Sequence, residues 1–178
     1  MKVHEEHKKK GPDIINFALI IVSTSRFNEL QENESTSDKT IPLVKQLLDQ
    51  HPGISLMSSE IVSDDNNQIK DMLKKLLDDN TIHAIIFSGG TGLSLKDITY
   101  ETIEPLLEKK IDGFGELFRY LSYKEIGASS MLSRALAGKI KDKVIFLLPG
   151  SPNAVKLALN NLILPEIKHI IYIVNKKE

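Results

Sequence analysis

Two patterns of hydrophobic and polar positions alternate along this chain, and each predicts a different kind of element. Short, nearly uninterrupted apolar runs rich in β-branched residues are typical of buried strands. They predict strands over residues 17–22, 54–62, 82–87 and 143–148. Apolar residues three and four positions apart indicate helices, and such stripes occur over residues 43–48, 69–77, 103–111, 114–121 and 154–162. The alternation predicts an α/β fold, a three-layer α/β/α sandwich around a mostly parallel sheet.

Polar segments and helix-breaking residues set the expected boundaries. The stretch from Ser23 to Asp38 is polar and is expected to form a loop, after which Thr40 is a candidate helix cap. Pro52-Gly53 is expected to end that helix, and Pro165 to end or kink the last one. Residues 1–12 are polar and predict a disordered tail, which leaves residues 13–178 as a single domain.

Composition excludes several classes of function. The chain has 178 residues, a formal net charge of −1 and no cysteine. The charge gives no electrostatic case for nucleic acid or an anionic membrane, and the lack of cysteine excludes disulfides and thiolate chemistry. No apolar run approaches the ~20 residues that a spanning helix needs, and no secretory signal opens the chain. A cytoplasmic protein is expected by default. His4 and His7 lie in the expected tail, and the scattered His51, His83 and His169 suggest packing or surface roles rather than metal binding.

Four loops follow the predicted strands directly. In parallel sheets, ligands bind beyond the carboxyl ends of the strands. These loops hold most of the small polar residues outside the helices; they cover residues 23–38, 63–67, 88–99 and 149–153. The sequence therefore predicts one site where the loops converge.

The third loop is the richest in candidate chemistry. Its three glycines, Gly89, Gly90 and Gly92, allow positive φ angles and close approach of the backbone to a ligand. Free N–H groups in such a turn bind anions. Neither a dinucleotide fingerprint nor a P-loop is present, because Leu95 replaces the third glycine of the former and Leu93 follows Gly92 where the latter needs Lys. A tight strand-to-helix turn without a ligand is the plain alternative.

With these residues in view, the chain resembles the molybdenum-cofactor biosynthesis proteins of the MoaB/MogA type, which include the G domain of gephyrin. The resemblance covers roughly residues 15–165, and residues 121–127 favour the MoaB branch. Its landmarks occur in the family's order and are Val22–Arg26, Ile61–Asp65, Ser88–Gly92, Lys96–Thr99, Gly113–Glu116 and Leu148–Pro152.

The resemblance implies a reaction, the transfer of AMP from Mg-ATP to the terminal phosphate of molybdopterin with release of pyrophosphate. It implies that Asp64 and Asp97 are the catalytic residues and Mg²⁺ ligands, although Ser63 stands where the family often has proline. The residues expected to bind ATP or molybdopterin are Ser23, Thr24, Ser25, Ser88, Gly89, Gly90, Thr91, Gly92, Lys96, Thr99, Glu116, Pro149, Gly150, Ser151 and Pro152.

Simpler structural roles exist for several of these residues. Asp97 has the position of a carboxylate at a helix start, and Asp64 lies in a turn rich in Asp and Asn. A lone lysine such as Lys96 is usually solvated. Ser151 could cap a helix, and Glu116 could simply begin one.

Two other functions remain open at this point. One is a non-catalytic molybdopterin carrier, which would not need the aspartate pair; the other is a scaffold, for which the sequence offers no appended interaction domain. The resemblance also implies a homotrimer or homohexamer and a molybdenum insertase as partner.

Overall fold

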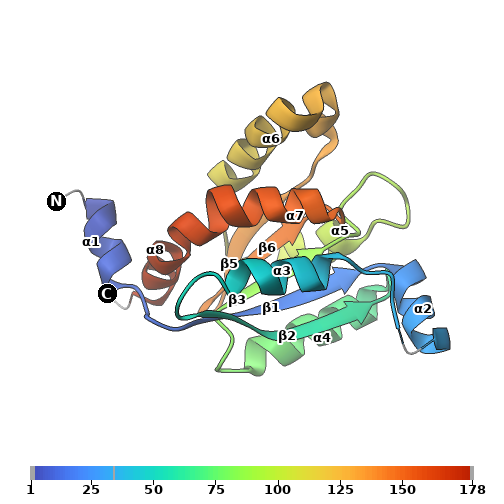
Figure 1. Ribbon diagram of the computed structural model, residues 1–178, viewed down its shortest axis with the longest axis horizontal. Helices are drawn as coiled ribbons and strands as arrows, with labels where there is room; N and C mark the ends of the chain where they lie inside the picture. The colour runs from blue at the N-terminus through green and yellow to red at the C-terminus, as the bar shows by residue number, and fades with distance from the viewer. Residues whose placement is uncertain (1–2, 34, 177–178) are drawn as a thin grey trace.

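A six-stranded sheet forms the middle layer of the protein, with the strand order β2-β1-β3-β6-β5-β4 (Figure 1). The computed structural model describes residues 3–33 and 35–176. The strands are β1 (Ile15–Val22), β2 (Ile54–Val62), β3 (Ala84–Ser88), β4 (Lys109–Lys110), β5 (Leu136–Ile140) and β6 (Lys143–Leu148). β2, β1, β3 and β6 are parallel, whereas β5 and β4 are antiparallel at one edge. The predicted α/β fold with a mostly parallel sheet is confirmed.

Helices cover both faces of this sheet (Figure 1). The long ones are α1 (Val3–Lys10), α2 (Thr24–Asn33), α3 (Thr40–Leu48), α4 (Asn66–Asp78), α6 (Asp112–Ile126) and α8 (Leu164–Asn175). The short ones are α5 (Thr99–Ile103), α7 (Pro152–Ala158), the 3₁₀ turns η1 (Glu104–Leu106) and η2 (Gly127–Leu132), and the π-helical turn η3 (Leu159–Ile163).

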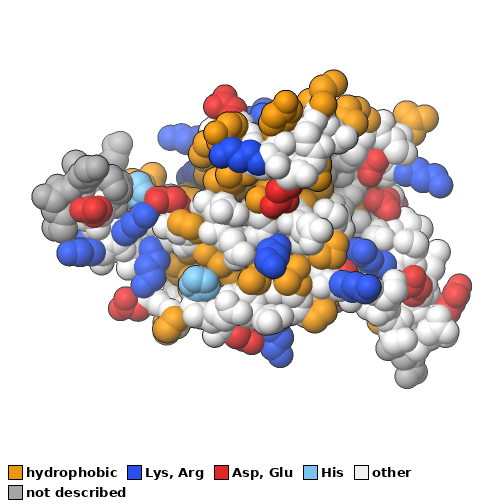
Figure 2. All heavy atoms as spheres, turned by 45° about the horizontal axis from the view of Figure 1, so that its top comes forward, with side chains coloured by type: hydrophobic (Ala, Val, Ile, Leu, Met, Phe, Trp, Pro, Cys, Tyr) orange, Lys and Arg blue, Asp and Glu red, His pale blue; other side chains and the backbone are white. Residues whose placement is uncertain are grey.

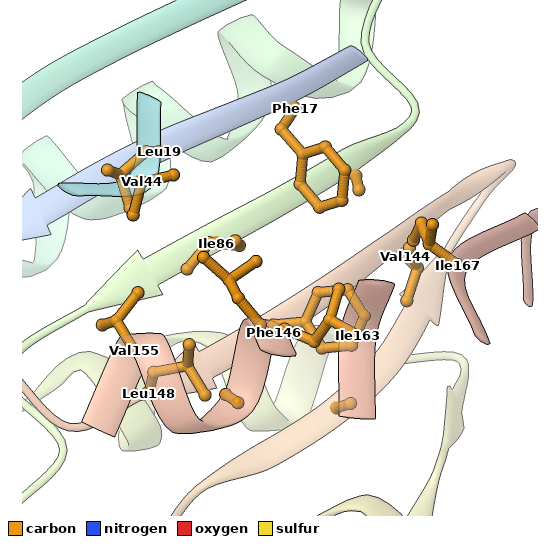
Figure 3. Close-up of a cluster of buried hydrophobic side chains, with 14 of the residues drawn as sticks. Phe17, Leu19, Val44, Ile86, Val144, Phe146, Leu148, Val155, Ile163 and Ile167 are labelled. Carbon is orange, nitrogen blue, oxygen red and sulfur yellow. The ribbon is translucent and has the colours of Figure 1, made fainter. Parts of the chain in front are cut away.

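Successive residues of the central strands pack into different layers, because side chains of a strand alternate between its two faces. On β1, Phe17 and Leu19 join the cluster under α3, α6, α7 and α8, whereas Ala18 and Ile20 join the cluster under α4 and α5. Figure 3 shows the first cluster, with Phe146 of β6 among the buried side chains. Both faces of the central strands are therefore covered, as their continuous apolar runs predict.

The segment after β1 differs from its prediction. The sequence predicts a loop from Ser23 to Asp38, but residues 24–33 form α2. No residue of α2 is buried, so the helix has no apolar stripe that could reveal it. The partly buried Phe27 packs against the core, and polar contacts also hold the helix: Arg26 pairs with Asp38 at 3.2 Å, and the Glu29 carboxylate accepts a 2.8 Å hydrogen bond from the Ser37 N–H. That N–H lowers the pKa of Glu29.

The cap of α3 also differs. Thr40 lies inside the helix and is fully buried, so its predicted role as the cap is wrong. The Asp38 carboxylate accepts a 2.7 Å hydrogen bond from the Ile41 N–H at the helix start. Asp38 thus stabilises α3 and pairs with Arg26 of α2.

The helix predicted over residues 103–111 is wrong. The short helical segment of α5 and η1 ends at Leu106. Lys109–Lys110 then form the edge strand β4, which pairs with β5. The sequence does not predict β5 because Gly138 interrupts its short run. A Cβ added at Gly138 would lie 2.6 Å from the carbonyl oxygen of Lys109, so glycine is what lets the two strands approach.

The C-terminal helical segment continues through Pro165. This proline lies in the first turn of α8, where it needs no hydrogen-bonded N–H, so it does not end the segment. Among the described residues, this segment, Pro152–Asn175, is the one helix long and apolar enough to cross a membrane by length and composition, which the sequence analysis did not expect. Core helices meet the same test, and Val155, Ile163 and Ile167 of this segment belong to the hydrophobic core.

Most of the expected N-terminal tail is helical. The sequence predicts disorder over residues 1–12, whereas Val3–Lys10 form α1, which packs against α8. The rings of His7 and His169 lie 5.3 Å apart, and Lys8 pairs with Glu166 at 2.5 Å. The two predicted units of the chain are therefore in contact.

A buried lysine lies at the start of β6. Lys143 is 1% exposed, and its ammonium group donates hydrogen bonds of 2.8 and 2.7 Å to the carbonyl oxygens of Asp79 and Ile82. We expect Lys143→Met to lower the free energy of unfolding by about 2 kcal/mol, because hydrogen bonds from charged groups are lost. Urea denaturation measures this, with the exposed Lys156→Met as control. An equal change in both variants would contradict it.

Candidate functional site

The carboxyl ends of β1, β3 and β6 meet at one edge of the sheet and enclose a cavity of about 500 Å³. The loops that follow β1, β2, β3 and β6 all contribute to its wall, as expected for loops at the carboxyl ends of parallel strands. It brings together the following predicted site residues: Ser23, Ser25, Asp64, Gly89, Gly90, Thr91, Gly92, Asp97, Pro149 and Gly150.

The glycine-rich loop after β3 has a backbone that other residues rarely adopt. Gly89 and Gly90 have φ angles of 109° and 62°. The Gly89 N–H donates to the Leu148 carbonyl at 3.0 Å, which joins the ends of β3 and β6. In the described part of the chain, no acceptor contacts the N–H groups of Gly90, Thr91, Gly92 or Leu93. A run of free N–H groups in such a turn favours an anion.

Asp64 is held in place by Thr24, at the start of α2. Its Oδ2 accepts hydrogen bonds from the Thr24 N–H at 2.9 Å and from the Thr24 hydroxyl at 2.8 Å. The Asp64 N–H donates back to Thr24 Oγ1 at 3.1 Å. Thr24, predicted to bind a ligand, therefore orients the carboxylate in this structure.

The other oxygen of Asp64 faces the glycine-rich loop. A Cβ added at Gly90 would lie 3.1 Å from Asp64 Oδ1 and 2.2 Å from Thr99 Oγ1. Thr99 is fully buried, and its hydroxyl has no hydrogen-bond partner among the described residues. Gly90 and Thr99, near the two ends of the loop after β3, thus converge with Asp64 of the loop after β2.

Asp97 folds back on its own loop. Its Oδ2 accepts a 3.0 Å hydrogen bond from the Ser94 N–H, and a Cβ added at Gly92 would lie 2.8 Å from the same oxygen. Leu95, between them, is fully exposed. Asp97 therefore lies beside the glycine-rich loop and lines the same cavity as Asp64.

Other predicted residues lie around this cavity rather than on its wall. Lys96 and Thr24 line an adjoining cavity of about 680 Å³, which shares Asp64 with the first. The Ser88 hydroxyl donates to the Pro149 carbonyl at 3.2 Å. Ser151 caps α7 by accepting from the Ala154 N–H, and Pro152 is the first residue of that helix.

Glu116 is separated from the aspartates. It lines a different hollow of about 470 Å³, together with Arg119 of the same helix. That hollow adjoins the main cavity through Ser133 and Arg134.

Arg134 is the main site residue that the sequence analysis missed. It lines the main cavity and contacts the glycine-rich loop. Its hydrogen bonds to Glu101 lower the pKa of that carboxyl group, which favours the carboxylate form of Glu101. Arg134 lies in an irregular segment before β5, where no motif distinguishes it.

Comparisons with known proteins agree on one family. A family model described as "Probable molybdopterin binding domain" matches residues 18–169. Molybdenum cofactor biosynthesis protein B of Bacillus cereus is 42% identical over 168 residues, which cover 94% of this chain and 95% of that protein.

Solved structures extend the agreement to the fold. A crystal structure of molybdenum cofactor biosynthesis protein B superposes with a TM-score of 0.83 at 39% identity, covering 92% of this chain and 98% of that chain. The tungsten cofactor synthesizing protein MoaB from Pyrococcus furiosus gives 0.79 at 33% identity, with coverage of 93% and 99%. A structure of MogA gives 0.76 at 26% identity, with coverage of 89% and 99%.

Proposed function

From the premise that the chain belongs to the molybdopterin-binding family of MoaB and MogA, we propose that it acts in molybdenum or tungsten cofactor biosynthesis. Its reaction is the transfer of AMP from ATP to the terminal phosphate of molybdopterin. An oxygen of that phosphate attacks the α-phosphorus of ATP, the bond to the β-phosphate breaks, and pyrophosphate leaves. The product is adenylylated molybdopterin, which a molybdenum insertase would then use.

The nucleophile in this reaction needs no general base. A phosphate monoester has a second pKa of about 6, so it is already an anion at neutral pH. The difficulty is to bring two polyanions together, which calls for positioned N–H groups and cations.

One observation carries the proposal: two carboxylates and a run of free N–H groups line the same cavity. Gly90, Thr91 and Gly92 line this cavity, and their N–H groups, with that of the next residue, Leu93, suit the phosphates of ATP. The cavity meets the adjoining one at Asp64, so two substrates could occupy neighbouring spaces with their reacting groups beside this residue. A plain strand-to-helix turn would not need this arrangement.

The residues present fit a magnesium ion. Mg²⁺ is usually held by one or two carboxylates together with water and substrate phosphates. Asp64 and Asp97 supply two carboxylates, and no group of three or more metal-binding side chains occurs among the described residues. When bound there, the ion would neutralise charge on the ATP phosphates and on the leaving pyrophosphate.

Turnover tests the proposal. Purified protein is incubated with molybdopterin, ATP and Mg²⁺, and adenylylated molybdopterin and pyrophosphate are followed over time. Equal amounts of both products are expected. If molybdopterin binds tightly but neither product forms, the protein is a carrier and the proposed reaction is wrong.

The Thr24–Asp64 contact gives a further prediction. Thr24→Val removes the hydroxyl that both donates to and accepts from Asp64. We expect the turnover rate to fall about tenfold, because the carboxylate loses its orientation. The matched control is Thr81→Val, since the N–H and hydroxyl of Thr81 both donate to Asp79, away from the cavity. Equal turnover rates of Thr24→Val and wild type would contradict the role of Thr24 in orienting Asp64.

An exposed apolar face on α6 and η2 supports the expected homotrimer or homohexamer. Figure 2 shows hydrophobic side chains gathered over α6, and large apolar patches mark interaction surfaces. The large hydrophobic residues more than half exposed there are Leu117, Tyr120, Tyr123, Ile126, Met131 and Leu132.

We expect the double substitution Leu117→Glu with Tyr120→Glu to shift the mass toward that of a monomer, because charges would lie in the subunit interface. Light scattering coupled to size exclusion measures this. The control is Ile14→Glu, at an exposed apolar residue directly before β1 and outside α6 and η2. A wild-type protein that is monomeric at every concentration would contradict the prediction.

A further inference from the structure

Arg134 reaches across the fold to the backbone of the glycine-rich loop. Its Nε donates to the Thr91 carbonyl at 2.9 Å, and its Nη2 donates to the Gly92 carbonyl at 2.6 Å. On the other side of the guanidinium, Nη1 and Nη2 both contact the Glu101 carboxylate, the latter at 3.2 Å. The guanidinium carbon also lies 4.7 Å from the centre of the Tyr100 ring.

These contacts commit the guanidinium to the protein. All three of its nitrogen atoms donate to loop carbonyls or to Glu101. The charge is partly balanced by Glu101, and Tyr100 covers one face. Arg134 is thus built to hold the loop rather than to bind a phosphate directly.

Holding the two carbonyls also fixes two N–H groups. In a trans peptide the C=O and the N–H point in opposite directions. The Thr91 carbonyl therefore sets the direction of the Gly92 N–H, and the Gly92 carbonyl sets that of the Leu93 N–H. These two N–H groups have no acceptor among the described residues.

Other hydrogen bonds hold the two ends of the loop, where the Gly89 N–H donates to the Leu148 carbonyl and the Thr99 N–H donates to the Gly90 carbonyl at 2.8 Å, but they do not reach the carbonyls of Thr91 and Gly92. Glycines lose the most conformational freedom on folding, and Leu93 and Leu95 are 70% and 100% exposed, so the loop is not packed there. The Ser94–Asp97 hydrogen bond secures its far end, but only Arg134 contacts the carbonyls of Thr91 and Gly92 among the described residues.

We propose that Arg134 is a positioning residue that, together with Glu101, fixes the N–H groups of Gly92 and Leu93 for binding the phosphates of the nucleotide. The part of this proposal that concerns phosphate binding, the ligand clause, rests on the proposed function. The part that concerns the order of the glycine-rich loop, the loop-ordering clause, does not, because it concerns the protein without substrate.

Two measurements test the proposal on the intact chain. Hydrogen–deuterium exchange of the segment 88–98 is measured without ligand, and the affinity for inorganic pyrophosphate and for Mg-ATP is measured by calorimetry. We expect Arg134→Ala to speed exchange of this segment and to weaken both affinities, each by about tenfold, from the loss of charge-assisted hydrogen bonds. Arg119→Ala is the matched control, since the one hydrogen bond of the Arg119 side chain to a described residue is a 3.5 Å contact with the Ser133 carbonyl.

Two further arms separate loop positioning from loss of charge or of stability. Arg134→Lys keeps the charge but lacks the planar fork that reaches both carbonyls and Glu101, so it is expected to stay weak. Free guanidinium at millimolar concentration is expected to restore part of the affinity of Arg134→Ala and to leave Arg119→Ala unchanged.

Each contrary outcome has a distinct meaning. Unchanged exchange in Arg134→Ala overturns the loop-ordering clause, and unchanged affinity with faster exchange overturns the ligand clause. Full recovery in Arg134→Lys shows that charge alone matters and overturns positioning. A wild-type protein that binds neither pyrophosphate nor Mg-ATP overturns both the proposed function and the ligand clause, whereas the exchange result still decides the ordering clause.

Discussion

Asp97→Asn is expected to lower the rate of AMP transfer about a hundredfold, equivalent to ~2.7 kcal/mol of transition-state stabilisation. Asparagine has nearly the same shape, and its side-chain oxygen can still accept from the Ser94 N–H, so the loop should keep its structure. What is lost is one negative charge beside the glycine-rich loop. With less charge available for magnesium, both the bound ATP and the leaving pyrophosphate are less well stabilised.

Initial rates of pyrophosphate release, measured over a range of magnesium concentrations, provide the check. The matched control is Asp71→Asn, an exposed aspartate on α4, which should retain the wild-type rate. A recovery of Asp97→Asn at high magnesium would indicate weakened metal binding. Rates equal to wild type at low magnesium would mean that Asp97 has only a structural role.

Gly89→Ala is expected to lower the free energy of unfolding by about 3 kcal/mol, through backbone strain and a steric clash. Gly89 has a φ of 109°, and a Cβ there would lie 2.2 Å from the carbonyl oxygen of Val22. That oxygen belongs to the backbone of β1, so no side-chain rotation can relieve the contact. The clash would separate the ends of β1 and β3, where the cavity forms.

Gly113→Ala is the matched control, because a Cβ at Gly113 meets nothing within 4 Å and the residue lies in the first turn of α6. We expect its stability to stay the same or to rise by about 0.5 kcal/mol. Urea midpoints at equal protein concentration compare the two, since association shifts apparent stability. Similar midpoints for both variants would refute the strain at Gly89.

The sequence predicts the parts of the fold that depend on buried apolar patterns. β1 and β6 are covered on both faces, so their runs stand out, and the stripe of α4 has a single buried side. α2 and β4 could not be predicted in this way. α2 is held by one partly buried side chain, Phe27, and by an ion pair and hydrogen bonds with residues outside it, and β4 is two lysines at a sheet edge.

The residues of the candidate site also differ in whether the sequence could predict them. The loop glycines and both aspartates follow predicted strands, so topology alone brings them to one cavity. The role of Thr24 depends on α2 beginning at that residue, which the sequence did not indicate. Arg134 acts on a loop more than 40 positions away, and only the folded chain brings the two together.

The packing of α1 against α8 has a practical consequence. These first and last helices lie together on one side of the molecule, whereas β1 and β2 point toward the opposite side, where α2 and the cavity loops lie (Figure 1). A tether attached through α1 or through the end of α8 would therefore leave the cavity open. The protein could be fixed to a sensor surface in a known orientation while substrates flow freely to its open side.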